Sequence, residues 1–449
     1  MKIVEMKNKT IQTLNRTTNS FIQGGFSSDL VCLSFICIKA QLKGVCKMTE
    51  YKLLQKAELP FEVVILLIAG MTMLITGVLL FPVSAGTLPY HENGLYGLLL
   101  VMFALQTLTM GKTPFGDMRR SKPLLAVGVA IASVGIVTGV IPGLSSRIPR
   151  LLLFLCFGPG GFVLLLQMFF DKGKLRAWVK YGGILRRLIF GCAAVYGFSM
   201  LIALLLWQRS LLTTPLTAAT VLAYGVAIIY LAGVLAHIYG TYPETEKLRA
   251  GDVELSTEQV MLLLMGIFML LLGVLLIPVN LGLMPFSGSA QLGLLMVMFA
   301  VQMLASGNTP IGPFPRSWLM ILAGLLFAAL GIVSSIIPGI LVPALTVLVG
   351  VLNILGGFIS LAKINIPRLK KSTGSKEPVS PVLAKLFATQ LTLDLLSLLF
   401  GTATLVSNLI PGLVIGVVLA ANGCVLLYLL RIMFVLDKLR HEAASTGVV

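Results

Sequence analysis

The sequence predicts an all-α polytopic membrane protein of about twelve transmembrane helices, and three observations lead to this fold class. Of the 449 residues, 57% are hydrophobic and 11% are charged, and the mean hydropathy is +0.98. Apolar runs of membrane-spanning length recur along the chain between short polar loops. A long segment of the first half also returns in the second half. A water-soluble core cannot hide so much apolar surface, so we expect the lipid bilayer to be the partner that surrounds most of the chain.

The apolar runs divide into six before and six after one polar bridge. Each run is close to the roughly 20 residues that a helix needs to cross the hydrocarbon core. The expected spans are 62–82, 94–111, 123–142, 150–170, 184–206, 214–238, 258–279, 289–306, 318–339, 342–364, 381–406 and 410–436. The predicted organisation is a basic N-terminal segment (1–58), a first six-helix membrane repeat (59–238), a cytoplasmic linker (239–257), a second six-helix repeat (258–440) and a C-terminal tail (441–449).

The two halves share one sequence frame. The stretch Gly97–Ser121 returns as Gly293–Ser317, and without a gap 34 of the 74 positions of 70–143 are identical in 266–339. This identity indicates a duplication. Because each half has an even number of helices, the two copies are expected to run in the same direction, as parallel repeats about an axis along the membrane normal.

A finer period lies within the halves. Residues 136–143, 325–339 and 398–412 each end in Ile-Pro-Gly and are followed at once by another apolar run. Proline ends a helix because it lacks an N–H, and glycine permits the chain to reverse. We therefore expect each half to consist of three helical hairpins that turn at the outer face.

The residues around Pro338, GIVSSIIPGILVPALTVLVGVLNILGGFISL, resemble the helical hairpin of the HdeD-like acid-resistance membrane proteins. In that family a helix ends in a proline and a second helix closes on a Gly-rich turn. Gly160-Gly161 and Gly356-Gly357 stand where that turn would be. The resemblance implies a role in envelope or acid stress and supplies no catalytic residue.

The basic residues predict the orientation. With the N-terminus in the cytoplasm, the inner side of the membrane receives all but three of the 34 Lys and Arg residues, the exceptions being Arg147, Arg150 and Arg209. This bias is typical of membrane proteins, and it predicts an integral protein of a bacterial or archaeal cytoplasmic membrane with both termini inside. It also explains the net charge of +17 without nucleic acid, whose binding would need an extended soluble basic surface.

The N-terminal segment is polar, and its apolar patch at 30–38 is too short to span a membrane. We expect a disordered or loosely surface-bound leader, and Met48 is a plausible alternative start.

The sequence predicts no metal site, no cofactor and no enzyme. Its six cysteines form no C-x-x-C motif, and its three histidines are widely scattered. No Ser/His/Asp set or H-E-x-x-H motif can be assembled from it.

The repeated loop G-x-T-P-x-G, followed by Arg-Ser, is the most specific motif. It contains Thr113 and Arg120 in the first half and Thr309 and Arg316 in the second. A structural interpretation needs only a turn: threonine caps it, proline stiffens it, glycine permits positive φ, and arginine anchors at the headgroups. A functional interpretation makes the two loops a cytoplasmic gate or an anion contact. The copies diverge where Lys112, Asp117 and Arg119 are replaced by Asn308, Pro313 and Pro315.

Three polar side chains within the spans are further candidates for a pathway. Gln106 and Gln302 occupy equivalent positions, and the structural interpretation favours a packing pair at the interface of the halves. Asp394 is the acid placed well inside a span, which makes it a functional candidate with Arg431 as a potential partner.

Two functions are compatible with these patterns. One is a transporter-like permease for a small molecule or ion, with a pathway between the pseudo-symmetric halves. The alternative is a non-transporting structural protein, or one that serves in envelope or acid stress.

Overall fold

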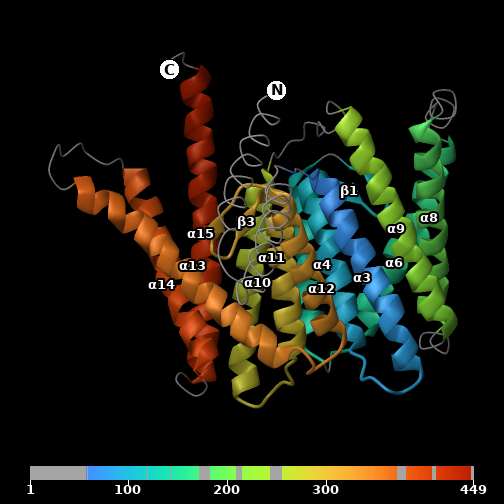
Figure 1. Cartoon of the computed structure of the whole chain (residues 1–449), viewed down its shortest axis with the longest axis horizontal. Helices are drawn as coiled ribbons and strands as arrows, with labels where there is room; N and C mark the ends of the chain where they lie inside the picture. The colour runs from blue at the N-terminus through green and yellow to red at the C-terminus, as the bar shows by residue number, and fades with distance from the viewer. Residues whose placement is uncertain are drawn as a thin grey trace, which may run out of the picture. The chain divides into compact units, whose positions relative to one another are not determined.

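The computed structural model of the chain describes residues 57, 59–118, 120–142, 144–170, 183–208, 215–242, 255–371, 381–406 and 411–445. In these ranges twelve helices are long and apolar enough to cross a membrane, and two short β-hairpins connect helix pairs (Figure 1). The helices are α3 (Phe61–Ser84), α4 (Glu92–Met110), α5 (Lys122–Val140), α6 (Arg147–Phe170), α8 (Ile184–Trp207), α9 (Pro215–Thr241), α10 (Thr257–Asn280), α11 (Gly288–Ser306), α12 (Trp318–Ile336), α13 (Val342–Lys371), α14 (Pro381–Leu405) and α15 (Gly412–Ser445). The antiparallel β-hairpins are β1 (Lys112–Thr113) with β2 (Gly116–Asp117), and β3 (Asn308–Thr309) with β4 (Gly312–Pro313).

The prediction of a multi-pass, all-α membrane protein is confirmed, and the membrane-spanning parts of the helices agree with the expected spans to within three residues at each end. Helix α15 continues to Ser445, so much of the predicted tail is helical. The N-terminal segment up to residue 56, with the apolar patch and Met48, lies outside the described residues. So do residues 243–254, which are most of the predicted linker.

Only some of the expected helical hairpins form helix pairs, such as α8 with α9 and α14 with α15. The tightest pairs are α3 with α9, α4 with α5 and α6 with α8 in the first half, and α10 with α15, α11 with α12 and α13 with α14 in the second. Helices α5 and α6, which Ile-Pro-Gly was expected to fold into a hairpin, touch only slightly. The hairpin prediction is therefore wrong for this pair.

Small residues explain the pairing that is observed. A Cβ added to Gly97 on α4 would lie 2.5 Å from the Gly135 carbonyl oxygen on α5, and one added to Gly77 on α3 would lie 2.7 Å from the Leu222 backbone nitrogen on α9. Backbones can approach this closely only without side chains between them, as is common between membrane helices. Gly273 on α10 meets α15 in the same way as Gly77 meets α9.

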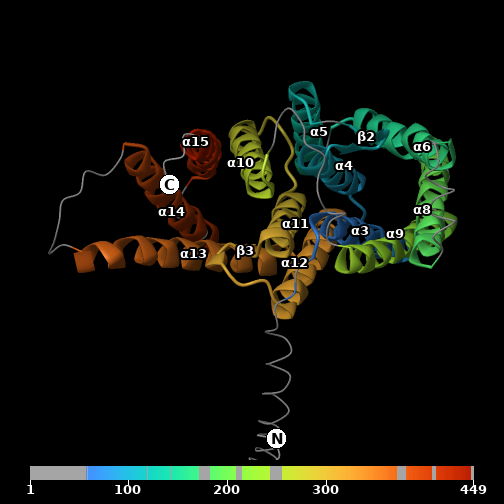
Figure 2. The same ribbon diagram turned by 90° about the horizontal axis from the view of Figure 1, so that it is seen from above.

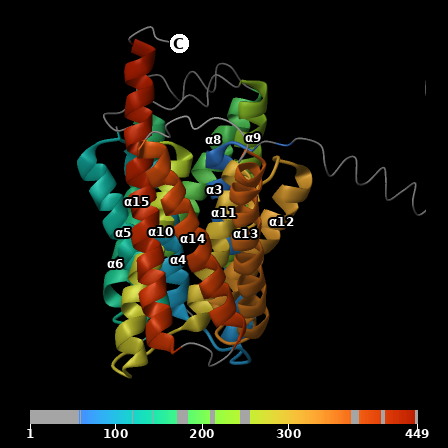
Figure 3. The same cartoon turned by 90° about the vertical axis from the view of Figure 1, so that its left-hand side faces the viewer.

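The same set of neighbours occurs in both halves. Seen from above in Figure 2, α3, α4, α6, α8 and α9 form a ring of neighbouring helices. Helices α10, α11, α13, α14 and α15 have the corresponding contacts. Figure 3 shows α15 beside α10, and α14 packs against α15.

The two halves meet through helices α3, α4 and α5 on one side and α10, α11 and α12 on the other, and the contacts are reciprocal. Helix α3 contacts α12 as α10 contacts α5. Two main-chain hydrogen bonds follow the same rule: His91 N donates to Ile336 O at 2.9 Å, and Ser287 N donates to Val140 O at 2.9 Å. Reciprocal contacts of this kind are what a two-fold relation between equivalent surfaces produces.

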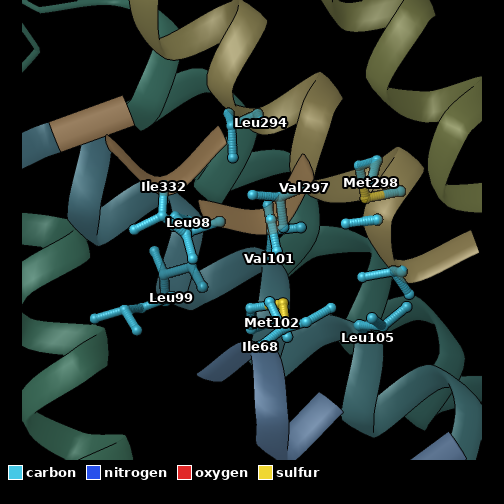
Figure 4. Close-up of a cluster of buried hydrophobic side chains, with 14 of the residues drawn as sticks. Ile68, Leu98, Leu99, Val101, Met102, Leu105, Leu294, Val297, Met298 and Ile332 are labelled. Carbon is cyan, nitrogen blue, oxygen red and sulfur yellow. The ribbon is translucent and has the colours of Figure 1, made fainter. Parts of the chain in front are cut away.

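Apolar side chains fill the interface between the halves. Figure 4 shows Leu98, Val101 and Leu105 of α4 close to Leu294 and Val297 of α11, with neighbours from α3 and α12. These side chains are at most 3% exposed and belong to one continuous hydrophobic cluster. The part of the interface drawn in Figure 4 is therefore dry, and α4 and α11 are central helices of the bundle.

Candidate functional site

The repeated loop forms a tight β-hairpin at one end of the helices, called here the hairpin end. Thr113 Oγ1 donates a hydrogen bond to Gly116 O at 2.8 Å and accepts one from Phe115 N at 3.3 Å. Gly111 ends α4 in the left-handed conformation with φ of 67°, and Ser121 caps the start of α5. The second copy repeats this geometry, with Thr309 Oγ1 donating to Gly312 O at 2.7 Å. Turn and cap chemistry thus accounts for the residues that the two copies share.

Both arginines of the repeated loop form hydrogen bonds with other segments of the chain. Arg120 Nη1 donates to the main-chain oxygen of Leu255 at 3.1 Å, which ties the first loop to the residues before α10. The main-chain oxygen of Arg316 accepts a hydrogen bond from Ala57 N at 3.2 Å. Arg120 thus links the two halves of the chain.

Each loop lies against a pair of glycines in the middle of a helix. A Cβ on Gly160 of α6 would meet the Pro114 carbonyl oxygen at 2.8 Å, and a Cβ on Gly356 of α13 would meet that of Pro310 at 2.0 Å. The expectation that these glycines form a turn is wrong, because α6 and α13 continue through them. Gly160 and Gly356 leave room for the loop, whereas Gly161 and Gly357 face α8 and α14.

A pocket of about 400 Å³ lies inside the first half, among α3, α4, α6, α8 and α9. This volume is in the range of small-molecule sites. Each helix contributes one face at helical spacing, as expected for side chains on one side of an α-helix. On α3 and α4 these faces are Glu62, Ile65, Leu66, Ala69 and Met73, and Leu99, Met102, Phe103, Gln106 and Met110.

The spacing also gives the depth of the pocket. From Glu62 to Met73 the lining of α3 covers ~16 Å at the rise of an α-helix, with Glu62 at the hairpin end. The hydrocarbon core of a bilayer is about 30 Å thick. The pocket therefore reaches from the hairpin end to about the middle of the membrane-spanning region.

The mouth of the pocket is polar and charged. Lys112 forms an ion pair with Glu62, and Tyr239 Oη donates to the other carboxylate oxygen of Glu62 at 2.5 Å. Asp117 lies opposite Lys112 in the β-hairpin register and also lines the pocket. Gln167 Nε2 donates to Phe115 O at 3.0 Å and holds the loop to α6.

The inner end of the pocket is apolar and aromatic. The Phe103 and Phe157 rings meet edge to face with centroids 5.3 Å apart, and Phe157 meets Tyr224 in the same way at 6.0 Å. Gln106 lies on the same face of α4 as Phe103, about one turn closer to the mouth. In the part of the chain that the structure describes, the Gln106 side chain lines the pocket and its amide makes no hydrogen bond.

The structure separates the residues that the sequence singled out. Gln106 and Thr113 line the pocket, whereas Gln302 and Thr309 lie in the second half and do not. Gln106 faces the pocket, so its preferred interpretation, a packing residue between the halves, is wrong.

Asp394 on α14 is 5% exposed and is held by neutral partners. Ser360 Oγ on α13 donates to one carboxylate oxygen at 2.8 Å, and Gln390 Nε2 donates to the other at 3.1 Å. Among the described residues no ion pair joins it to Arg431, so that expected pairing is wrong: the carboxylate faces α13. Gly357 approaches Asp394 as Gly161 approaches Tyr196 on α8, which places Asp394 where the first half has a pocket-lining tyrosine.

A second polar group lies at the opposite end of the helices. Both ring nitrogens of His91, the Tyr96 hydroxyl and Thr138 Oγ1 are buried without a hydrogen-bond partner in the described part of the chain. Burial lowers the pKa of His91 and raises the pKa of the neighbouring Tyr90. The negative charge of Glu92 also raises the pKa of Tyr90. Both groups are therefore held in their neutral forms.

Sequence reasoning missed the role of Glu62, which looked like an ordinary acid at the end of a span. It also missed Tyr196 and Tyr239. The signal available was the face of α3, where Glu62 begins a stripe of lining residues at helical spacing. The divergence at Lys112 and Asp117 did point to this corner, and both residues line the pocket. Arg119 lies outside the described residues.

Comparison of the chain with protein-family models, curated proteins and solved structures gave no match. The function is therefore argued from the geometry of the site. The chain is a multi-pass membrane protein, and in its described residues twelve helices are long and apolar enough to cross a membrane.

Proposed function

We propose that the protein is a transporter-like permease whose binding site is the pocket inside the first half. The observation that carries the proposal is this pocket itself: about 400 Å³, entered at the hairpin end and reaching to about mid-membrane, with a polar mouth and an apolar inner end. Known transporters place substrate near the middle of the bilayer, and the pocket reaches about that depth. The pathway between the halves that the sequence suggested is not favoured, because apolar side chains fill the interface region of Figure 4.

We further infer that the chain consists of two parallel repeats. Shared neighbours, reciprocal interface contacts and the paired hydrogen bonds of His91 and Ser287 support this arrangement. With the hairpin end in the cytoplasm, as the basic residues indicate, the pocket opens to the cytoplasm.

The repeats have diverged at the site. Glu62 has its counterpart in Glu258, but Lys112 is replaced by Asn308 and Asp117 by Pro313. The ion pair at the mouth is therefore a property of the first half. We infer that the second half serves as the scaffold against which the first half moves or is held.

Transport can be tested without knowing the substrate. A small-metabolite extract of cells is sealed into proteoliposomes, and the loss of each component is followed by mass spectrometry. We expect wild type to release specific components, Gln106→Leu to release them at least tenfold more slowly, and the matched Gln302→Leu to behave as wild type. Gln106→Leu removes the free amide of the pocket lining.

The alternative, a non-transporting structural or stress-related protein, is favoured by the dry interface between the halves. It predicts that no component leaves the proteoliposomes faster than from empty ones, or that Gln106→Leu and Gln302→Leu behave alike. Either result would reject the permease.

A further inference from the structure

The charges and shape of the pocket identify a class of ligand, an inference that rests on the proposed binding site. Among the described residues, three charged side chains line it: the carboxylates of Glu62 and Asp117, and the ammonium group of Lys112. Lys112 is paired with Glu62, which also accepts the hydrogen bond from Tyr239. This network satisfies Glu62, so the lining keeps one excess negative charge, at Asp117.

Asp117 is placed to meet a guest. Its residue is exposed at the mouth, and the register of the β-hairpin fixes it opposite Lys112. Gly116 beside it has φ of 127° and packs against the Gln167 amide, so the strand that carries Asp117 is held against α6. An oriented carboxylate next to a low-dielectric cavity attracts cations more strongly than one in open water.

The inner end is suited to an apolar body. Phe103, Phe157 and Tyr224 form a row of edge-to-face rings, and Met73 and Met102 line the same region. Methionine and aromatic side chains adapt to apolar guests of varied shape. A ligand that fills the pocket must therefore be apolar at one end and polar at the other.

We propose that the pocket binds amphipathic organic cations, with the apolar body against the aromatic row and the positive group between Asp117 and Gln106. The positions of Asp117 and Lys112 in the second half are occupied by Pro313 and Asn308, so this preference belongs to the first half. A free inorganic cation would leave the aromatic end of the pocket empty, and an organic anion would face the uncompensated carboxylate.

Three probes of similar shape but different charge separate the effect of ligand charge on binding from the effect of apolar contacts. They are phenylpropyltrimethylammonium, its uncharged analogue with a tert-butyl group in place of the trimethylammonium, and phenylpropanesulfonate. Binding to the purified full-length protein in nanodiscs is measured by calorimetry against empty nanodiscs, which corrects for partition into lipid. We expect the cation to bind at least tenfold more tightly than either of the other two.

Variants at single positions test whether Asp117 is the residue that gives the preference for a cation. Asp117→Asn is expected to weaken cation binding about tenfold, equivalent to about 1.4 kcal/mol, and to leave the uncharged analogue unaffected. Glu258→Gln, which removes an exposed acid at the second-half counterpart of Glu62, serves as the matched control and should bind as wild type. Equal thermal unfolding of the variants establishes that each is folded.

Three outcomes would overturn the proposal: equal affinity for the cation and its uncharged analogue, tighter binding of the sulfonate, or unchanged cation binding in Asp117→Asn. No binding of the cation tighter than about 1 mM would do so as well. The permease and the charge preference fail separately. Charge-dependent binding without movement across a liposome membrane rejects transport alone, whereas movement of the sulfonate alone rejects the cation preference.

Discussion

At the scale of single residues, the carboxylate of Glu62 holds the mouth of the pocket together. It joins three segments that are distant in sequence. It lies in the first turn of α3, pairs with Lys112 in the β-hairpin, and accepts a hydrogen bond from the hydroxyl of Tyr239 near the end of α9. Side-chain bonds to a charged group are among the stronger ones in proteins.

Tyr239→Phe should therefore lower stability through one lost hydrogen bond. We expect a loss of about 1 kcal/mol, the order of magnitude for a partly exposed bond of this kind. Thermal unfolding in detergent measures it, with Tyr230→Phe on the same helix as control, because the Tyr230 residue is 40% exposed. Equal unfolding temperatures for the two variants would contradict the role of Tyr239.

His91 predicts a dependence of stability on pH. Burial lowers its pKa in the folded protein below the ordinary value of about 6.5. The unfolded chain then binds more protons than the native one as pH falls below 6.5, so stability is complete above that value and declines towards acid. The main chain of Ser335 acts on the pKa of His91 in the opposite direction, but burial is the larger effect, so the sign holds.

Unfolding temperatures at pH 7.5 and pH 5.5 test this sign. His91→Gln should reduce the difference between the two temperatures, whereas His237→Gln, on the exposed side of α9, should leave it as in wild type. An unchanged difference in His91→Gln would show that another group carries the acid sensitivity.

At the scale of elements, close helix pairs depend on glycines that nothing else could replace. Gly77→Ala on α3 would place a Cβ within 2.8 Å of the Leu222 backbone on α9, whereas Gly233→Ala, on α9 itself, meets nothing within 4 Å. Overpacking costs about 1–3 kcal/mol, while alanine in an open helix position is neutral or favourable. We expect Gly77→Ala to unfold at clearly lower temperature than wild type, and Gly233→Ala not to. If both variants unfold alike, the α3–α9 contact is not as close as described.

The elements also show how far the sequence could lead. The spans were predictable because length and hydropathy are local properties, and the turn chemistry of the repeated loop was predictable residue by residue, as Thr113 and Thr309 confirm. Which helices pack together was not, because the fit of Gly97 against Gly135 becomes visible only when two helices are side by side. The hairpin prediction assumed that helices joined at the outer face must pair.

The site was only partly predictable for the same reason: contacts between segments that are distant in sequence decide the roles of its residues. Gln106 was found from its polarity, but Glu62 and Tyr239 are 177 residues apart in sequence and gain their role only through contact. Asp394 attracted attention as an acid inside a span, yet its partners are the neutral Ser360 and Gln390. A buried acid identified by sequence is a candidate, and its neighbours decide what it does.

At the scale of the whole molecule, two halves with the same neighbours hold different chemistry. The interface region of Figure 4 is apolar, the pocket lies within the first half, and the polar positions at its mouth have changed in the second half. The asymmetric site thus lies where the two halves differ in sequence. We therefore expect water and ligand to enter the first half at the hairpin end.

Cysteine labelling tests this route of entry. Gln106→Cys and Gln302→Cys, which differ in half and share one position in the repeat, are each made in a chain whose six cysteines have been replaced by serine or alanine. A membrane-impermeant maleimide is applied to sealed vesicles that expose the hairpin end. We expect the maleimide to label position 106 rapidly and position 302 only slightly. Phenylpropyltrimethylammonium should slow the labelling of position 106. Equal labelling of both positions, or labelling at 302 alone, would contradict this route of entry.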